Sequence, residues 1–228
     1  MLADAIAKPS ALLFDLDGTL LDTAPDFHVV VNRLLAEEGR DERDYAFVRA
    51  QVSNGSQALV CSAFDITPDA ADFSRLRARL LDLYLQHVSV YTCLFDGLED
   101  VLGLARAASI PWGIVTNKPR LYSEALLARQ PDLQDCAVLV CPDDVSRRKP
   151  HPEPLYKACE TLAIDPSTAI YVGDHLRDIE SGKAAGMFTI GVEYGYLEET
   201  SPATSWGADL VVATGPELAS WFRHQPWT

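Results

Sequence analysis

Two aspartates, Asp15 and Asp17, stand one residue apart at the end of a short apolar run, and Gly18 follows them. One carboxylate of such a pair can attack a phosphorus atom, while the other gives or takes the proton of the leaving group. Together they can also hold a hard cation such as Mg²⁺. Aspartate and glycine equally favour an ordinary turn, so residues further along the chain must decide between these interpretations.

Two further groups of polar residues follow in order. Thr116 and Asn117 come directly after an apolar run and offer a hydroxyl and an amide to phosphate oxygens. Lys149 belongs to the basic segment 147–150, where a lysine could neutralise both a phosphate and an attacking carboxylate. A plain strand end and a solvated basic loop are the alternatives for these two groups.

A second acidic pair, Asp174 and Asp178, follows the apolar run 170–172. One turn of helix would return Asp178 to the side of Asp174. Oxygen atoms are the ligands that Mg²⁺ prefers in proteins. We therefore predict a site for a hard cation such as Mg²⁺ that is built from Asp15, Asp174 and the backbone carbonyl of Asp17, with Asp178 close by.

Parallel strands would bring these scattered residues together. Short apolar runs, each a predicted strand, alternate with helical patterns at residues 11–14, 112–115, 137–140, 169–172 and 188–192. This alternation is typical of βαβ units and therefore predicts an α/β fold with a parallel sheet. Because open α/β sheets bind ligands at the carboxyl ends of their strands, we expect the polar residues to share one edge.

The segment that follows the first strand has a different pattern. Apolar residues recur at helical spacing over residues 27–35 and again over residues 73–84. No strand pattern interrupts this region convincingly. We therefore expect an all-helical domain at residues 22–92, inserted into a core that consists of residues 1–21 and 93–228.

Composition limits the classes of function. The 228 residues carry a formal net charge of −14, which disfavours general attraction to nucleic acid or anionic membranes. No apolar run reaches transmembrane length, and residues 1–8 are too short for a signal peptide, so we expect a cytoplasmic protein. The five cysteines form no CxxC pair and predict neither a disulfide framework nor a zinc site. No segment indicates a protein partner.

The segment DLDGT at 15–19, Thr116, Lys149 and the segment GDHLRD at 173–178 resemble, in this order, the four motifs of the haloacid dehalogenase-like superfamily. The resemblance covers nearly the whole chain. It implies a Rossmann-like core and catalysis through a phosphoaspartyl intermediate. Asp15 would be the nucleophile and Asp17 the general acid and then the base. Thr116 would bind the phosphoryl group, Lys149 would balance its charge and orient Asp15, and the motif at 173–178 would complete the Mg²⁺ site.

Within this superfamily, residues 22–92 resemble the cap of the phosphoglycolate phosphatase-like branch. Such caps close over the site and select the substrate, which excludes bulk water during phosphoryl transfer. The residues Ser53, Asn54 and Gly55 resemble the substrate-reading loop of these caps, and a structural turn is the alternative for them. The resemblance therefore implies a substrate-binding role for Asn117 and Lys149 in the core and for this loop in the cap.

Other reactions of the superfamily fit the sequence less well. A dehalogenase needs neither the second aspartate of the first motif nor a cation. Cleavage of a carbon–phosphorus bond needs a lysine in the cap, and residues 21–95 contain none. A sugar-phosphate mutase shares the motifs and the cap type, so it stays as the second candidate. A phosphate-binding protein that has the fold but no catalytic activity is the third candidate.

The branch offers two candidate substrates, 2-phosphoglycolate and N-acetylmuramic acid 6-phosphate of peptidoglycan recycling. The overall layout and the tract YVGDHLRDIESGKAAGM at 171–187 favour the sugar phosphate by resemblance. Both candidates carry a carboxylate, which suggests an arginine of the cap as its ligand. Arg33, Arg49 and Arg75 are candidates, with Arg49 favoured among them because it shortly precedes Ser53; the interpretation that we favour for each of the three is a solvated helix residue.

Overall fold

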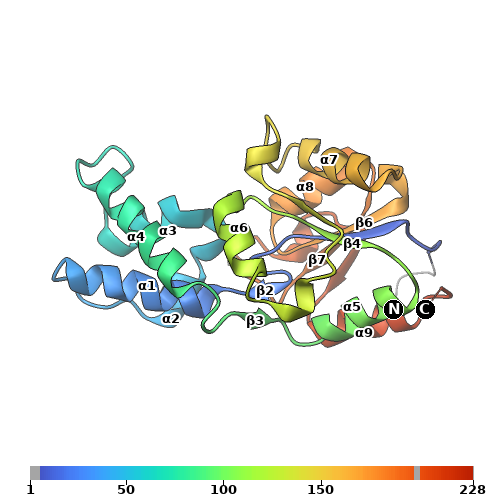
Figure 1. Cartoon of the computed structure of the whole chain (residues 1–228), viewed down its shortest axis with the longest axis horizontal. Helices are drawn as coiled ribbons and strands as arrows, with labels where there is room; N and C mark the ends of the chain where they lie inside the picture. Colours follow the sequence, from blue (N-terminus) through green and yellow to red (C-terminus); the bar gives the residue numbers. More distant parts are fainter. Residues whose placement is uncertain (1–5, 198–200, 228) are drawn as a thin grey trace.

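A computed structural model describes residues 6–197 and 201–227, which form a sheet lobe and a helical lobe (Figure 1). The sheet has six parallel strands in the order β5-β4-β1-β6-β7-β8. These strands are β1 Ala11–Phe14, β4 Trp112–Val115, β5 Val138–Val140, β6 Ala169–Gly173, β7 Phe188–Val192 and β8 Leu210–Val212. The predicted α/β fold with a parallel sheet is confirmed, and β8 is an edge strand that the sequence analysis missed.

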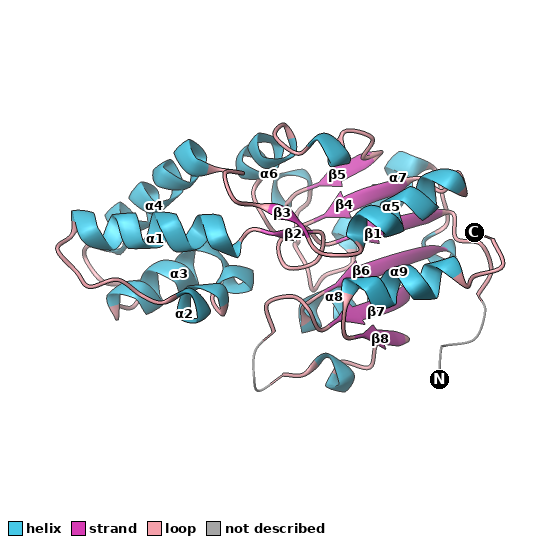
Figure 2. Ribbon diagram, turned by 90° about the horizontal axis from the view of Figure 1, so that it is seen from below, coloured by secondary structure: helices cyan, strands magenta, loops and turns pink. Residues whose placement is uncertain are grey.

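Helices cover both faces of the sheet (Figure 2). They are α5 Leu98–Ala107 and α9 Gly215–Arg223 on one face, and α7 Glu153–Leu162 and α8 Leu176–Ala185 on the other, with α6 Arg120–Leu127 beside the helical lobe. Leu12 and Phe14 pack into the cluster beneath α5 and α9, whereas Leu13 packs into the cluster beneath α7. Because successive side chains of β1 are buried on opposite faces, the strand is apolar throughout.

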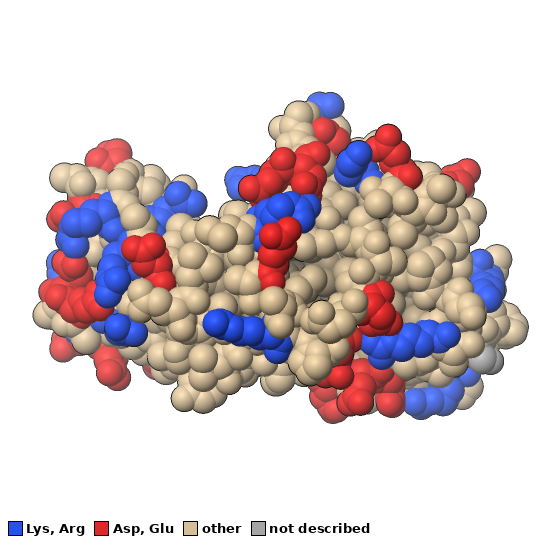
Figure 3. Space-filling view, viewed as in Figure 1, with Lys and Arg blue, Asp and Glu red and all other residues tan. Residues whose placement is uncertain are grey.

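The helical lobe contains α1 Ala24–Glu37, α2 Tyr45–Arg49, α3 Gly55–Phe64 and α4 Phe73–His87. The apolar faces of α1 and α4 pack together, and the rings of Phe27 and Tyr84 stack with their centroids 4.3 Å apart. Charged residues of both signs lie side by side on the outside of this lobe (Figure 3). Short 3-10 turns occur at Val52–Asn54, Pro131–Leu133, Pro142–Asp144, Pro166–Thr168 and Ala203–Ser205.

A short antiparallel ribbon connects the two lobes. It consists of β2 Leu21–Asp22 and β3 Cys93–Leu94, in which Leu21 pairs with Leu94. Beside it, the buried carboxylate of Asp26 accepts hydrogen bonds from the backbone N–H of Tyr91, at 2.9 Å, and from the hydroxyl of Thr92, at 2.6 Å. These hydrogen bonds hold the first turn of α1 against the segment that directly precedes β3, where the chain returns to the sheet lobe.

Candidate active site

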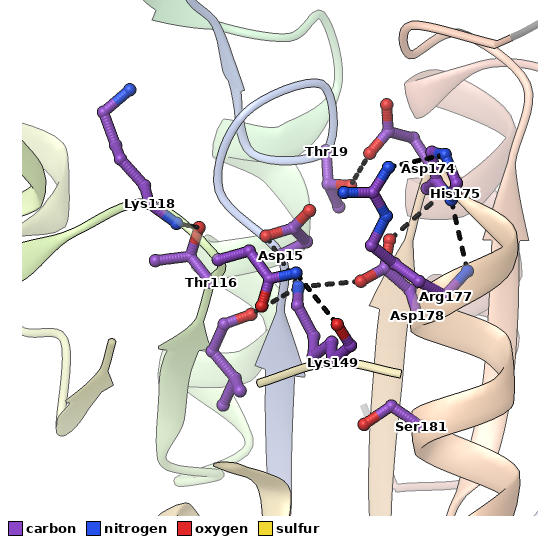
Figure 4. A network of polar contacts seen from close by, with 12 residues as sticks. Asp15, Thr19, Thr116, Lys118, Lys149, Asp174, His175, Arg177, Asp178 and Ser181 are labelled. Carbon is purple, nitrogen blue, oxygen red and sulfur yellow. Dashed lines mark hydrogen bonds and ion pairs between the residues drawn. The ribbon is translucent and has the colours of Figure 1, made fainter. Parts of the chain in front are cut away.

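The register of the central strands brings the predicted site residues to one edge of the sheet. Phe14 of β1 lies opposite Ile114 of β4 and Val172 of β6. Parallel strands in this register end at the same level, so Asp15 and Thr116 emerge beside each other, with Asp174 on the far side of Asp15 (Figure 4).

The ammonium of Lys149 lies among four oxygen atoms beneath this edge. It is 2.9 Å from Asp15 Oδ1 and 2.7 Å from Asp178 Oδ1, and the lysine side chain is only 1% exposed. It also donates hydrogen bonds to the Val115 carbonyl at 2.8 Å and to the Tyr171 hydroxyl at 2.7 Å. Its positive charge is therefore buried between two carboxylates, as Figure 4 shows.

Asp15, Asp174 and Asp178 form an acidic cluster in which one oxygen from each lies within 4.8 Å of the others. Burial raises the pKa of Asp174 to about 7, and the charges of Asp15 and Asp178 add to this effect. Burial also raises the pKa of Asp15. Two buried carboxylates and the partly buried Asp15, with one lysine between two of the three, leave an excess of negative charge, and this donor set fits a hard divalent cation.

The turn after β1 is shaped to admit the Asp174 carboxylate. Gly18 has a φ of +90°, and a Cβ built on it would lie 2.1 Å from Asp174 Oδ2. The hydroxyl of Thr19 donates to Asp174 Oδ1 at 3.1 Å. Glycine is required here for its conformation and for the close approach of the carboxylate.

The Asp17 carboxylate lies outside the acidic cluster and faces the helical lobe. Its Oδ1 accepts from the hydroxyl of Thr23 at 2.6 Å and is 2.8 Å from the ammonium of Lys118. Lys118 lies over the rings of Phe27 and Tyr84, 5.0 and 4.6 Å from their centroids. Burial lowers the pKa of Lys118, but the charge and hydrogen bond of Asp17, together with those of Tyr84, outweigh burial and the net shift is upward. Lys118 directly follows Asn117, but no role for it was predicted from the sequence.

Thr116 and Asn117 both line the site, but their side chains already have partners. The Thr116 hydroxyl accepts from the backbone N–H of Lys118 at 3.1 Å. The amide of Asn117 donates to the Lys149 carbonyl at 3.1 Å and so helps to hold the loop that carries this lysine. Asn117 therefore positions Lys149 in addition to facing the cavity.

A cavity of about 1060 Å³ opens above the acidic cluster, between the two lobes. Asp15, Asp17, Thr116, Asn117 and Lys149 line it from the sheet, and Ser53, Asn54 and Gly55 line it from the helical lobe. The structure thus gathers the predicted catalytic and substrate-binding residues around one space. Asp174 and Asp178 lie beneath them with Asp15.

The loop around Ser53 contacts the acidic end of the site. The Ser53 hydroxyl is 3.4 Å from Asp174 Oδ2. Arg177, from the first turn of α8, donates to the Ser53 carbonyl at 3.0 Å and to Asn54 Oδ1 at 3.2 Å. Arg177, which the sequence analysis did not single out, therefore joins the sheet lobe to this loop.

The segment after β7 connects the acidic cluster to the ribbon. The backbone N–H of Tyr196 donates to Asp174 Oδ2 at 2.8 Å. The hydroxyl of the same tyrosine donates to Asp22 Oδ1 at 2.7 Å and accepts from the backbone N–H of Ala24 at 2.9 Å. One buried residue thus contacts both a predicted metal ligand and the start of the helical lobe.

The three arginines that the sequence suggested as carboxylate ligands do not line the cavity. Arg33 and Arg75 form ion pairs with Glu37 and Glu38 on the outside of the helical lobe. Arg49 crosses to the sheet lobe and donates to the carbonyls of Tyr194 and Gly195 at 2.9 and 2.7 Å. The preference for Arg49 was wrong because nearness to Ser53 in sequence did not fix the direction of its side chain.

Comparison with known proteins agrees with this geometry. The family model described as haloacid dehalogenase-like hydrolase matches residues 12–192. The chain belongs to this family. The family resemblance and the expectation of an enzyme of this class, both derived from the sequence, are therefore confirmed.

Curated relatives of this haloacid dehalogenase-like chain are named as phosphatases. An N-acetylmuramic acid 6-phosphate phosphatase of Pseudomonas putida is 44% identical over 208 residues, covering 91% of this chain and 93% of the relative. A phosphoglycolate phosphatase of Xanthomonas campestris pv. campestris is 40% identical over 216 residues, covering 93% and 97%.

A solved structure shows the same fold as this haloacid dehalogenase-like chain. It is that of a predicted phosphoglycolate phosphatase from Haemophilus somnus, which superposes with a TM-score of 0.83 at 22% identity and covers 94% of this chain and 98% of its own. Among residues 6–197 and 201–227, no helix has both the length and the apolar character needed to cross a membrane.

Proposed function

We propose that this protein is a Mg²⁺-dependent phosphomonoester phosphatase that acts through a phosphoaspartyl intermediate. The observation that carries the proposal is the position of Lys149, whose buried ammonium lies 2.9 Å from Asp15 and 2.7 Å from Asp178 at the floor of the cavity. A cation fixed there holds Asp15 in place and offsets negative charge on a phosphoryl group beside it. The family relationship supports the same reaction.

The two steps assign different roles to the paired aspartates. Asp15 attacks phosphorus, and its new bond to phosphorus forms as the ester P–O bond breaks, while Asp17 gives its proton to the leaving oxygen. Water then attacks phosphorus and Asp17 takes its proton, so that phosphate leaves and Asp15 is restored. Lys118 contacts only Oδ1 of Asp17 in the structure, and Asp17 must carry a proton before the first step.

Asp15, Asp174 and Asp178 would hold Mg²⁺, with the backbone carbonyl of Asp17 as a further predicted ligand. When bound, the cation supplies electrostatic stabilisation of the phosphoryl oxygens. Thr116 lies beside Asp15 at the strand ends and would bind those oxygens.

The helical lobe would act as the cap. The cap would be residues 22–92, which contain its four helices, and the core would be residues 1–21 and 93–228. The two chain connections between cap and core then both run through the β2–β3 ribbon. Ser53, Asn54 and Gly55 line the cavity from the side of the helical lobe. This position supports a substrate-binding role for the loop and the exclusion of water when the lobes close.

The proposed substrate is N-acetylmuramic acid 6-phosphate, which would give the enzyme a role in peptidoglycan recycling. The 44% identity to the Pseudomonas putida relative supports it. So does the cavity of about 1060 Å³, because pockets for drug-sized ligands measure roughly 300–1,000 Å³ and a two-carbon acid would leave much of the space unfilled. The alternative is 2-phosphoglycolate, which the 40% identity to the Xanthomonas relative favours.

Hydrolysis of p-nitrophenyl phosphate with Mg²⁺ and with excess EDTA tests the class of reaction. We expect metal-dependent phosphate release by the wild type, and none by Asp15→Asn with its fold intact. Asp41→Asn, at an exposed position, is the matched control and should keep wild-type activity. Normal hydrolysis by Asp15→Asn would contradict the covalent mechanism.

Comparison of kcat/KM for the two candidate substrates then tests specificity. A clear preference for 2-phosphoglycolate would overturn the choice of the sugar phosphate. A sugar-phosphate mutase would move phosphate between positions without net release, and a binding module would do neither.

A further inference from the structure

Three arginines line the cavity without a carboxylate partner among the residues that the structure describes: Arg77, Arg148 and Arg177. The chain has 33 acidic residues and only 19 lysines and arginines. The two arginines that flank Arg77 on α4 do form ion pairs, Arg75 with Glu38 and Arg79 with Glu37. An anion that enters the cavity would therefore meet guanidinium groups that no carboxylate of the described residues occupies.

Arg77 and Arg148 are the arginines of this group that are available to a ligand, and Arg77 is the one that the helical lobe contributes. Its Nε donates to the Ser56 hydroxyl at 2.9 Å, and within the described part of the chain its two Nη atoms have no hydrogen-bond or ion-pair partner. Arg177 is already engaged by the loop at Ser53 and Asn54. Arg148 belongs to the loop of Lys149, close to the proposed phosphoryl site.

The position of Arg77 separates it from the groups that would handle the phosphate. It belongs to α4 of the helical lobe, whereas Lys149 and the acidic cluster belong to the sheet lobe. Leu81 and Tyr84 from α4 and Tyr122 from α6 line the cavity too, and supply apolar surface for the body of a leaving group. The cavity therefore offers a cationic group on the leaving-group side.

We propose that Arg77 binds a carboxylate on the leaving group and so selects phosphate monoesters that carry a second anionic group. A guanidinium presents parallel N–H donors that match the two oxygens of a carboxylate. This inference rests on the proposed phosphatase function. It replaces the arginines suggested from the sequence with one that faces the cavity.

The test compares two sugar phosphates that differ in the O3 lactyl group, which carries the carboxylate: N-acetylmuramic acid 6-phosphate and N-acetylglucosamine 6-phosphate. The measured quantity is the ratio of their kcat/KM values. We expect Arg77→Gln to lower this ratio about 10- to 100-fold, mainly through KM, because it removes a charge-assisted contact. Arg77→Lys keeps the charge and should recover part of the loss. Arg75→Gln, two residues away on the same helix and paired with Glu38 on the outer surface, should keep the wild-type ratio.

A binding measurement separates this inference from the proposed function. Calorimetry with N-acetylmuramic acid 6-phosphate and the Asp15→Asn protein needs no turnover, and adding Arg77→Gln to it should weaken binding about 10- to 100-fold. Unchanged binding and an unchanged ratio in Arg77→Gln would overturn the inference while leaving phosphatase activity in place. Absence of any phosphatase activity would overturn the proposed function, and the binding comparison would still decide the role of Arg77.

Discussion

Replacement of Lys149 by methionine is the most direct probe of the acidic cluster. Methionine is similar in length but removes the ammonium that lies 2.9 Å from Asp15 and 2.7 Å from Asp178. Breaking a buried ion pair by removal of one partner costs about 3–5 kcal/mol, because the remaining charge stays buried without a partner. For a chain of this size, 1 kcal/mol corresponds to about 2–4 °C in Tm, so we expect Tm to fall by about 6–20 °C.

The assay is thermal and urea unfolding of the metal-free protein in EDTA. Lys157→Met is the matched control, because Lys157 also has an ion pair, with Glu160, but is 47% exposed. Exposed pairs contribute about 0–1 kcal/mol, so this variant should unfold close to the wild type. If the free energy of unfolding of Lys149→Met lay within 1 kcal/mol of the wild-type value, the reasoning would be refuted.

A second variant keeps the prediction testable if Lys149→Met does not fold. Asp178→Asn leaves Lys149 paired with Asp15 and still offers an oxygen to the Tyr171 hydroxyl, which is 3.2 Å from Asp178 Oδ1. Its loss in the free energy of unfolding should be smaller, about 1–3 kcal/mol. If Asp178→Asn lost more free energy of unfolding than Lys149→Met, the result would contradict the role of Lys149 as the cation that pairs with both carboxylates.

Three further predictions concern residues around the site. Gly18→Ala, measured by Mg²⁺ titration of activity, should need more Mg²⁺ for half-maximal rate, because its Cβ would lie 2.1 Å from Asp174 Oδ2; an unchanged Mg²⁺ requirement would count against this contact. Arg177→Gln should raise KM more than it lowers kcat, since it frees the loop carrying Asn54, and an effect on kcat alone would argue against loop positioning. Asp26→Ala should lower the free energy of unfolding in urea by about 2–4 kcal/mol, because it leaves buried donors unsatisfied; a loss below 0.5 kcal/mol, on the order of a surface substitution, would show that water replaces them.

Much of the fold could be predicted because parallel strands that are buried on both faces are continuously apolar. Strands β1, β4, β6 and β7 follow this rule and were expected at their observed places. Strand β8 was missed because its three residues lie at the sheet edge and two of them are only half-buried. The ribbon strands β2 and β3 have two residues each, which is too short for any periodicity.

The core of the site was predictable for a related reason. Asp15, Thr116 and Asp174 each follow a recognisable strand, so the strand pattern alone brought them to one edge. The side chains of Lys118 and Arg77 gave no such signal. Their partners come from other elements: Asp17 in the first loop for Lys118, and Ser56 at the start of α3 for Arg77.

The sequence by itself determined the sheet, the order of the motifs and the residues that share the carboxyl edge, because strand burial and the direction of parallel strands follow from local pattern. Only the tertiary structure decided how the helical lobe lies against the sheet. That placement sends Arg49 to the carbonyls of Tyr194 and Gly195 and leaves Arg77 facing the cavity. The physical reason is that a long side chain takes its direction from partners distant in sequence, and its position along the chain does not specify them.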